Sequence, residues 1–136
     1  MQAYLLMLQA DEDDRYFTQS VLDEMQHTFP MHFIASIQEL PELVKDKGLP
    51  SVMLINNHDH RHLAIEVVKQ IKSDPALAHI PVVVLGEITT ADYIRKYYQA
   101  GANTYVTKPS TVALMKKKIR LFLEYWFEVA EVQLQH

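Results

Sequence analysis

The chain has 136 residues, of which 49% are hydrophobic and 22% are charged, as expected for one globular domain with its own core. Its 13 Lys and Arg against 17 Asp and Glu give a net charge of -4, so the overall charge gives no reason to expect nucleic-acid binding. The lack of cysteine excludes disulfides and thiolate metal sites, and no apolar run approaches the roughly 20 residues of a membrane span. The first residues lack the basic segment of a signal peptide. We therefore expect one cytoplasmic domain covering residues 1-136, with no nucleic-acid or membrane partner.

The first half of the chain alternates short apolar runs with helical periodicity. Apolar runs without polar alternation predict strands that are buried on both faces. Segments whose apolar residues recur every three to four positions predict amphipathic helices. These criteria predict strands at 4–8, 33–35 and 51–56 and helices at 13–27 and 38–47.

The second half continues the same alternation and ends in a long helix. It predicts strands at 80–85 and 103–106, and helices at 63–73, from 89–92 to Gly101, and from 110 or 111 to about 132. Five strands that alternate with five helices indicate a parallel sheet covered on both faces. Chemical sites in such sheets lie at the carboxyl ends of the strands. Those ends carry Gln9-Ala10-Asp11, Asn56, Gly86 and Lys108.

Two stretches of sequence resemble a known family. They are 71–75 leading to 80–85, and 100–103 leading to 105–106 and 108–109. With these anchors the chain, from Leu5 to about Val129, resembles the response-regulator receiver family, the CheY-like phosphoacceptor domains. The resemblance implies a flavodoxin-like, doubly wound α/β sheet of five parallel strands in the order 2-1-3-4-5, with five helices. The extended C-terminal helix is similar to that of stand-alone receivers without an output domain.

The resemblance fails at the residues that carry the family's chemistry. Receivers have a phosphoacceptor aspartate at the end of the third strand, and Asn56 stands there. They have two acidic residues that hold Mg²⁺ after the first strand, where Gln9 and Ala10 align. A shift of one residue would bring Asp11 into the second place. They have a serine or threonine after the fourth strand, where Gly86 has no hydroxyl.

Two family features are kept. Lys108 matches the lysine that contacts the phosphoryl group, and Tyr105 matches the aromatic switch position. The resemblance also implies a cis bond between Lys108 and Pro109.

A carboxamide is a poor nucleophile and a weak ligand for a hard cation, so we expect neither phosphorylation nor a Mg²⁺ cofactor. The leading hypothesis is a non-enzymatic pseudo-receiver that works by protein binding in a two-component or phosphorelay pathway. Its partner would be a sensor kinase or another signalling component. The alternative is a divergent but active phosphoacceptor that uses Asp59 or Asp11.

The segment that follows Asn56 is rich in histidine. Imidazoles and a carboxylate suit Zn²⁺ or Ni²⁺, and clustered histidines titrate near neutral pH. A third hypothesis is therefore a metal- or pH-responsive regulator, although alternating histidines fit a solvated loop better than a closed metal site. The candidate ligands are His58, His60 and His62, with Asp59 between them.

Two helices carry more aromatic and apolar residues than one buried face requires. In the last helix Met115, Ile119, Phe122, Trp126 and Val129 form one stripe, and Leu114, Leu121, Tyr125 and Val132 form a second that Lys118 interrupts. The surplus predicts an interface, and a homodimer through the 89–101 helix and the last helix. The predicted interface residues are Tyr93, Tyr97, Tyr98, Leu121, Tyr125 and Trp126. We interpret the basic run at 116–120 as a solvated face.

Overall fold

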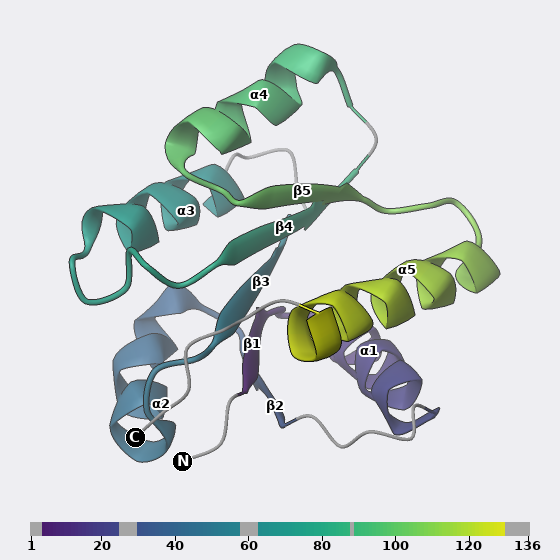
Figure 1. Cartoon of the computed structure of the whole chain (residues 1–136), viewed down its shortest axis with the longest axis horizontal. Coiled ribbons are helices and arrows are strands. Elements are labelled where there is room, and N and C mark those ends of the chain that lie inside the picture. Colours follow the sequence, from purple (N-terminus) through teal and green to yellow (C-terminus); the bar gives the residue numbers. More distant parts are fainter. Residues whose placement is uncertain (1–3, 25–29, 58–62, 88, 130–136) are drawn as a thin grey trace.

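The computed structural model describes residues 4–24, 30–57, 63–87 and 89–129. In this part of the chain, five parallel strands form one sheet in the order β2-β1-β3-β4-β5 (Figure 1). The prediction of five parallel strands in the order 2-1-3-4-5 is therefore confirmed. The strands are β1 Leu5–Leu8, β2 Met31–Ile34, β3 Val52–Asn56, β4 Val82–Gly86 and β5 Thr104–Thr107.

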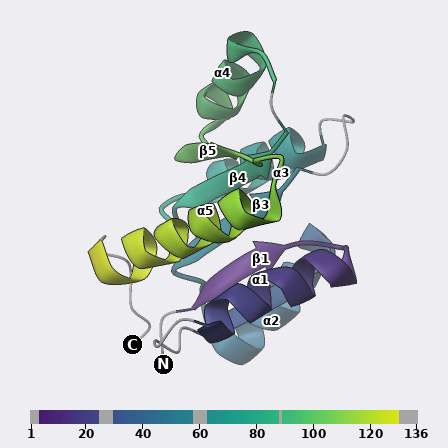
Figure 2. The same ribbon diagram turned by 90° about the vertical axis from the view of Figure 1, so that its right-hand side faces the viewer.

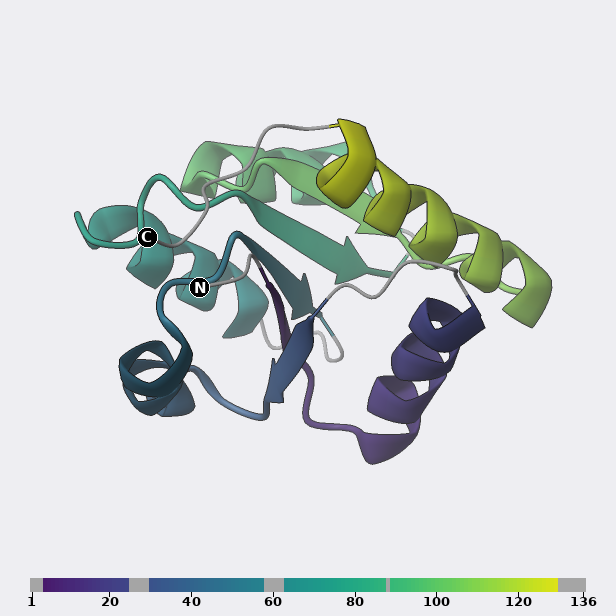
Figure 3. The ribbon, with the colours of Figure 1, turned by 60° about the horizontal axis from the view of Figure 1, so that its bottom comes forward.

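Helices cover both faces of the sheet. α1 and α5 lie together in front of the sheet in Figure 2, and α2, α3 and α4 cover the opposite face (Figures 1 and 3). The helices are α1 Glu12–Glu24, α2 Leu40–Lys47, α3 Leu63–Ser73, α4 Ala91–Ala100 and α5 Val112–Glu124. A 3₁₀ turn, Ile37–Glu39, leads into α2, and a π-helical turn, Tyr125–Val129, continues α5.

Each strand contributes alternate residues to two separate cores, because successive side chains of a strand point to opposite faces. Met53 and Ile55 pack against α2, α3 and α4, whereas Leu54 packs against α1 and α5. The alternation places the next residue, Asn56, on the α1–α5 side. It likewise places Gln9 on the α1–α5 side, because Met7 of β1 packs there.

The register brings the carboxyl ends of β3, β4 and β5 to one edge of the sheet. Asn56 lies beside Leu85, and Gly86 lies beside Thr107. The loops that carry Gln9 and Lys108 leave the sheet at this same edge. Residues far apart in the sequence therefore meet there, as the strand pattern predicts.

Helix ends are set by local capping. Thr90 accepts from the backbone N–H of Tyr93 at the start of α4, and Gly101 ends it with a left-handed backbone (φ 112). Ser36 and Glu39 form a capping box, so the chain turns one residue before the predicted start at Gln38.

The structure also bears on the expected cis peptide bond and on the expected lack of a membrane span. The bond between Lys108 and Pro109 is trans, so the cis bond implied by the resemblance is wrong. In the residues that the structure describes, no helix has both the length and the apolar character that crossing a membrane requires.

Candidate functional site

A cavity of about 60 Å³ lies at the carboxyl edge of the sheet, on the α1–α5 side. Five polar or charged side chains line it: Gln9, Asn56 and Lys108, which the sequence singled out, and Asp14 and Thr18, which it did not. The remaining lining is apolar: Met7, Phe17, Leu85, Met115 and Ile119. Sequence reasoning missed Asp14 because its acidic run was explained by the helix start alone. The available signal was its place one turn into a helix that begins at this edge.

Asn56 stands at the end of β3, and its amide is buried. Neither Nδ2 nor Oδ1 has a hydrogen-bond partner among the described residues. Burying an amide without a partner costs about 1–3 kcal/mol, so this position carries a local cost in stability. The amide cannot form an acyl phosphate, and it is a poor ligand for a hard cation.

The residues after β1 are engaged in local hydrogen bonds. The backbone N–H of Asp11 donates to Oε1 of Gln9 (3.0 Å), and Gln9 is only 2% exposed. Oδ1 of Asp11 accepts from the backbone N–H of Asp14 (3.1 Å), so Asp11 caps the start of α1. Asp11 does not line the cavity, and Ala10 faces a separate groove beside α3. The two residues that directly follow β1 thus offer an amide and a methyl group, and the Asp11 carboxylate is used as a helix cap.

Lys108 brings the positive charge of the site. Burial lowers the pKa of its ammonium group, and the nearby carboxylates of Glu87 and Asp14 act in the opposite direction. Its backbone N–H donates to the carbonyl of Gly86 (2.8 Å), which fixes the loop after β5 to the end of β4. The charges beside Lys108 are thus those of Glu87 and Asp14.

Gly86 has no room for a side chain. A Cβ built there would overlap the hydroxyl of Tyr105 and lie 2.7 Å from its Cζ. The Tyr105 hydroxyl donates to the carbonyl of Glu87 (3.0 Å). Tyr105 therefore fills the space that a side chain at position 86 would occupy.

Tyr105 is part of a tyrosine cluster that joins β5 to α4 and to the end of β3. Its ring centroid lies 5.3 Å from that of Tyr97. Asn57 Nδ2 donates to the hydroxyls of Tyr97 (2.8 Å) and Tyr93 (3.3 Å). Burial raises the pKa of the Tyr97 and Tyr105 hydroxyls, so both stay neutral at physiological pH.

The cluster corrects the predicted interface on α4. Tyr97 is completely buried, so its assignment to an interface is wrong. Tyr93 is half-buried and Tyr98 is exposed. The spacing of these tyrosines shows which of them share a face of the helix, but not whether that face points into the core or to the solvent.

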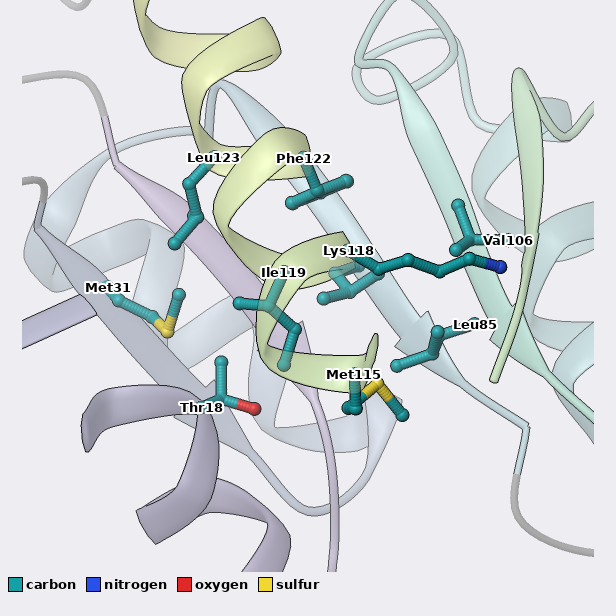
Figure 4. Close-up of a pocket in the computed structure, with 10 residues that line it drawn as sticks. Thr18, Met31, Leu85, Val106, Met115, Lys118, Ile119, Phe122 and Leu123 are labelled. Carbon is teal, nitrogen blue, oxygen red and sulfur yellow. The ribbon is translucent and has the colours of Figure 1, made fainter. Parts of the chain in front are cut away.

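The described part of the last helix carries residues of both stripes that the sequence predicts, whereas the Val129 side chain and Val132 lie outside the described part of the chain. Ile119 and Leu123 are buried, and Met115, Phe122 and Trp126 are half-buried against the same core, with an apolar cavity of about 20 Å³ among them (Figure 4). On the other side, Val112, Leu114, Leu121 and Tyr125 are exposed. A groove of about 480 Å³ runs between β5 and α5, lined by Asn103, Thr104, Val106, Lys118, Leu121, Phe122, Tyr125 and Trp126.

The histidine segment, His58, His60 and His62 with Asp59, lies outside the described residues. Among the residues that the structure does describe, no three His, Asp or Glu side chains gather closely enough to hold a metal ion.

Comparisons with known proteins agree with the fold. No protein-family model matches the chain. It is 34% identical over 80 residues to the probable methanogenesis regulatory protein FilR2 of Methanothrix harundinacea, covering 59% of this chain and 52% of that protein. It is 35% identical over 60 residues to the chemotaxis protein CheY of Pseudomonas aeruginosa, covering 44% and 48%. The chain thus spans about half the length of these curated relatives.

Solved structures match nearly the whole chain. The phosphorylated cyanobacterial phytochrome response regulator RcpA matches with a TM-score of 0.82 at 22% identity, over 97% of this chain and 99% of that one. A response regulator in red light signalling of R. palustris matches with a TM-score of 0.84 at 19% identity, over 98% and 99%. The fold is therefore that of response-regulator receiver domains.

Proposed function

We propose that this chain is a receiver domain of two-component or phosphorelay signalling that acts without being phosphorylated, as a non-enzymatic protein-interaction module. The receiver assignment is supported by the fold over nearly the whole chain and by the partial sequence similarity to CheY. The phosphorylation-independent role rests on the residues at the carboxyl edge of the sheet.

The observation that carries the proposal is the buried Asn56 amide at the end of β3. In-line phosphoryl transfer needs a nucleophile and a metal ion that neutralises the developing charge. Asn56 supplies no carboxylate, and the loop after β1 places Gln9, not an acid, in the cavity. Lys108 alone cannot hold Mg²⁺, because an ammonium group repels it.

Gly86 and Tyr105 support a single working conformation. A receiver that responds to phosphorylation needs two arrangements of similar energy. With no side chain at residue 86, the Tyr105 ring fills that space and stays bonded to Glu87 and packed on Tyr97. We infer that the α4–β5 side is presented to partners in this one form.

The proposed partners are proteins: a sensor kinase or another signalling component, and a second copy of the chain. The exposed apolar residues of α5 and the groove beside β5 are the surface for such contacts. Aromatic residues such as Tyr125 are frequent anchors of interfaces.

Intact-protein mass spectrometry after incubation with acetyl phosphate and Mg²⁺ tests the proposal. We expect no added phosphoryl group on the wild-type protein, under conditions that phosphorylate a conventional receiver treated in parallel. The matched variant Asn56→Asp, which replaces the side-chain amide with a carboxylate, is treated and measured in the same way. A base-labile phosphoryl group on wild-type Asp59 or Asp11 would overturn the proposal and establish the divergent phosphoacceptor instead.

A further inference from the structure

The groove of about 480 Å³ between β5 and α5 has one wall that is formed by a single face of the helix. The lining residues of α5 and of the turn after it stand at positions i, i+3, i+4, i+7 and i+8, which share one helical face. They are Lys118, Leu121, Phe122, Tyr125 and Trp126, and the opposite wall consists of Asn103, Thr104 and Val106. The groove has the volume of a small-molecule pocket, which is about 300–1,000 Å³.

The helical wall of the groove is charged at one end and apolar or aromatic along the rest. Lys118 is the one charged residue among the described residues that line the groove. Leu121 and Phe122 follow one turn later, and Tyr125 and Trp126 follow after about 10 Å of helix. A ligand that matches this wall has one negative end and an apolar body of about the same length.

Lys118 has hydrogen-bond donors left for such a negative end. Its Nζ donates to the carbonyl of Thr107 (2.6 Å), which holds the ammonium group beside β5. An ammonium group has three N–H donors, and Lys118 forms no ion pair with another described residue. The neighbouring Lys116 and Arg120 are instead directed to Glu24 of α1 (3.4 and 3.6 Å). A carboxylate in the groove therefore finds two further donors on Lys118.

The inner side of the groove borders a small void. Val106, Lys118 and Phe122 line both the groove and the apolar cavity of about 20 Å³ (Figure 4). A close-packed interior resists the movement of a side chain, because the side chain meets neighbouring atoms at once. Phe122 borders empty space instead, so its ring can shift inward. The void is about the size of one water molecule, which leaves room for a slender alkyl chain in the groove but not for a second ring beneath it.

We propose that this groove binds a free medium-chain carboxylate such as octanoate. The carboxylate accepts hydrogen bonds from Nζ of Lys118, and the extended alkyl chain lies along Leu121 and Phe122 towards Trp126. Burial of the chain against Leu121, which is 53% exposed, supplies the hydrophobic part of the binding. The inference goes beyond the proposed function, because it gives the groove a small-molecule ligand that competes with protein contacts at the same place.

Tryptophan fluorescence tests the binding directly, because Trp126 lines the groove and is the one tryptophan of the sequence. The wild-type protein is titrated with octanoate and, separately, with octylammonium, which has the same chain and the opposite charge. Both are kept below the concentrations at which they form micelles. We expect a saturable change with each, and about tenfold tighter binding of octanoate, because Lys118 attracts the carboxylate and repels the ammonium group.

Two matched variants locate the charge that sets this preference. Lys118→Met removes the ammonium group and keeps an unbranched side chain, so the preference for octanoate should be lost. Lys117→Met makes the same change at an exposed neighbour that does not line the groove, so the preference should remain. Circular dichroism of each variant checks that it is folded.

Three results would overturn the inference. The first is a wild-type protein whose fluorescence shows no saturable change with octanoate. The second is equal binding of octanoate and octylammonium to the wild type. The third is a preference for octanoate that Lys118→Met leaves intact or that Lys117→Met removes as well. None of these results bears on phosphorylation, which the mass measurement tests without any amphiphile, so the two proposals fail independently.

Discussion

Two adjacent asparagines at the end of β3 have opposite surroundings. Asn56 points to the α1–α5 side, where its amide has no partner among the described residues. Asn57 is buried on the α3–α4 side, where its amide donates to Tyr97 and Tyr93. The alternation of a strand thus assigns one amide to the cavity and the other to the tyrosine cluster.

This contrast predicts opposite effects of the same substitution at the two positions. Asn56→Leu replaces an unpaired buried amide with methyl groups on the same branching, so we expect the free energy of unfolding to stay the same or to rise by about 1 kcal/mol. Asn57→Leu leaves the Tyr97 hydroxyl without its donor, so we expect a loss of about 1–3 kcal/mol. Urea unfolding measures both values. An equal loss in the two variants would mean that Asn56 is held by hydrogen bonds after all.

The need for glycine at position 86 comes from the lack of space for a side chain and not from the backbone conformation. Its φ does not lie in the left-handed region, which the structure reserves for Gly48 and Gly101, so alanine can adopt its backbone. The obstacle is the ring of Tyr105.

We therefore expect Gly86→Ala to lower the free energy of unfolding by about 1–3 kcal/mol, because the ring must move from its place between Glu87 and Tyr97. In the double variant Gly86→Ala with Tyr105→Leu, the clash is removed and the cost of the alanine should largely vanish. Urea unfolding of the wild type, the two single variants and the double variant measures the coupling energy between positions 86 and 105. Independent, additive effects would contradict the steric explanation.

At the scale of elements, tyrosine hydroxyls join parts of the fold that are distant in sequence. The hydroxyl of Tyr4, at the start of β1, donates to the carbonyl of Gly48 at the end of α2 (2.6 Å). Burial raises the pKa of Tyr4 to about 12. This hydrogen bond connects the first strand to the helix that covers it.

The raised pKa predicts how stability depends on pH. Because Tyr4 ionises near pH 10 in the unfolded chain and near 12 in the folded one, its contribution is fully present below pH 10 and is lost as the pH rises through 12. Tyr4→Phe should be less stable near neutral pH by about 1 kcal/mol, since it lacks the hydrogen bond. Its stability should also fall less steeply between pH 10 and 12. Unfolding in urea at several pH values compares the two slopes, and identical slopes would contradict the assignment.

The sequence predicted most elements and the edge at which the site lies. Apolar runs locate all five strands, and Thr90 and Gly101 mark both ends of α4, because these signals are local. The burial of the Tyr97 side chain was not predictable, because the spacing of residues defines a helical face but does not say which element packs against it. The role of Gly86 depends on Tyr105, nineteen positions later, and appears only when β4 and β5 are paired. Asp14 was missed because the helix start already explained its acidic run, and its nearness to Lys108 appears only in the folded chain.

At the scale of the whole molecule, the fold is that of a receiver, and we propose that its carboxyl edge works without phosphoacceptor chemistry. The sheet still brings Asn56, Gly86 and Lys108 to one place. We propose that this pocket needs no metal, because Asp14 is the one carboxylate in its described lining, so no cluster of like charges has to be neutralised. The proposed interaction surface on α5 does not depend on this pocket.

The most direct test of this account is an amide NMR titration with Mg²⁺ and beryllofluoride, which mimics an acyl phosphate in receivers. We expect no change at Asn56, Gly86, Tyr105 and Lys108, because Asn56 offers no carboxylate to hold the phosphate mimic, and Asp14 is the one carboxylate that lines the pocket. Saturable shifts at these residues would show that the pocket still recognises phosphoryl geometry and would contradict a phosphorylation-independent module.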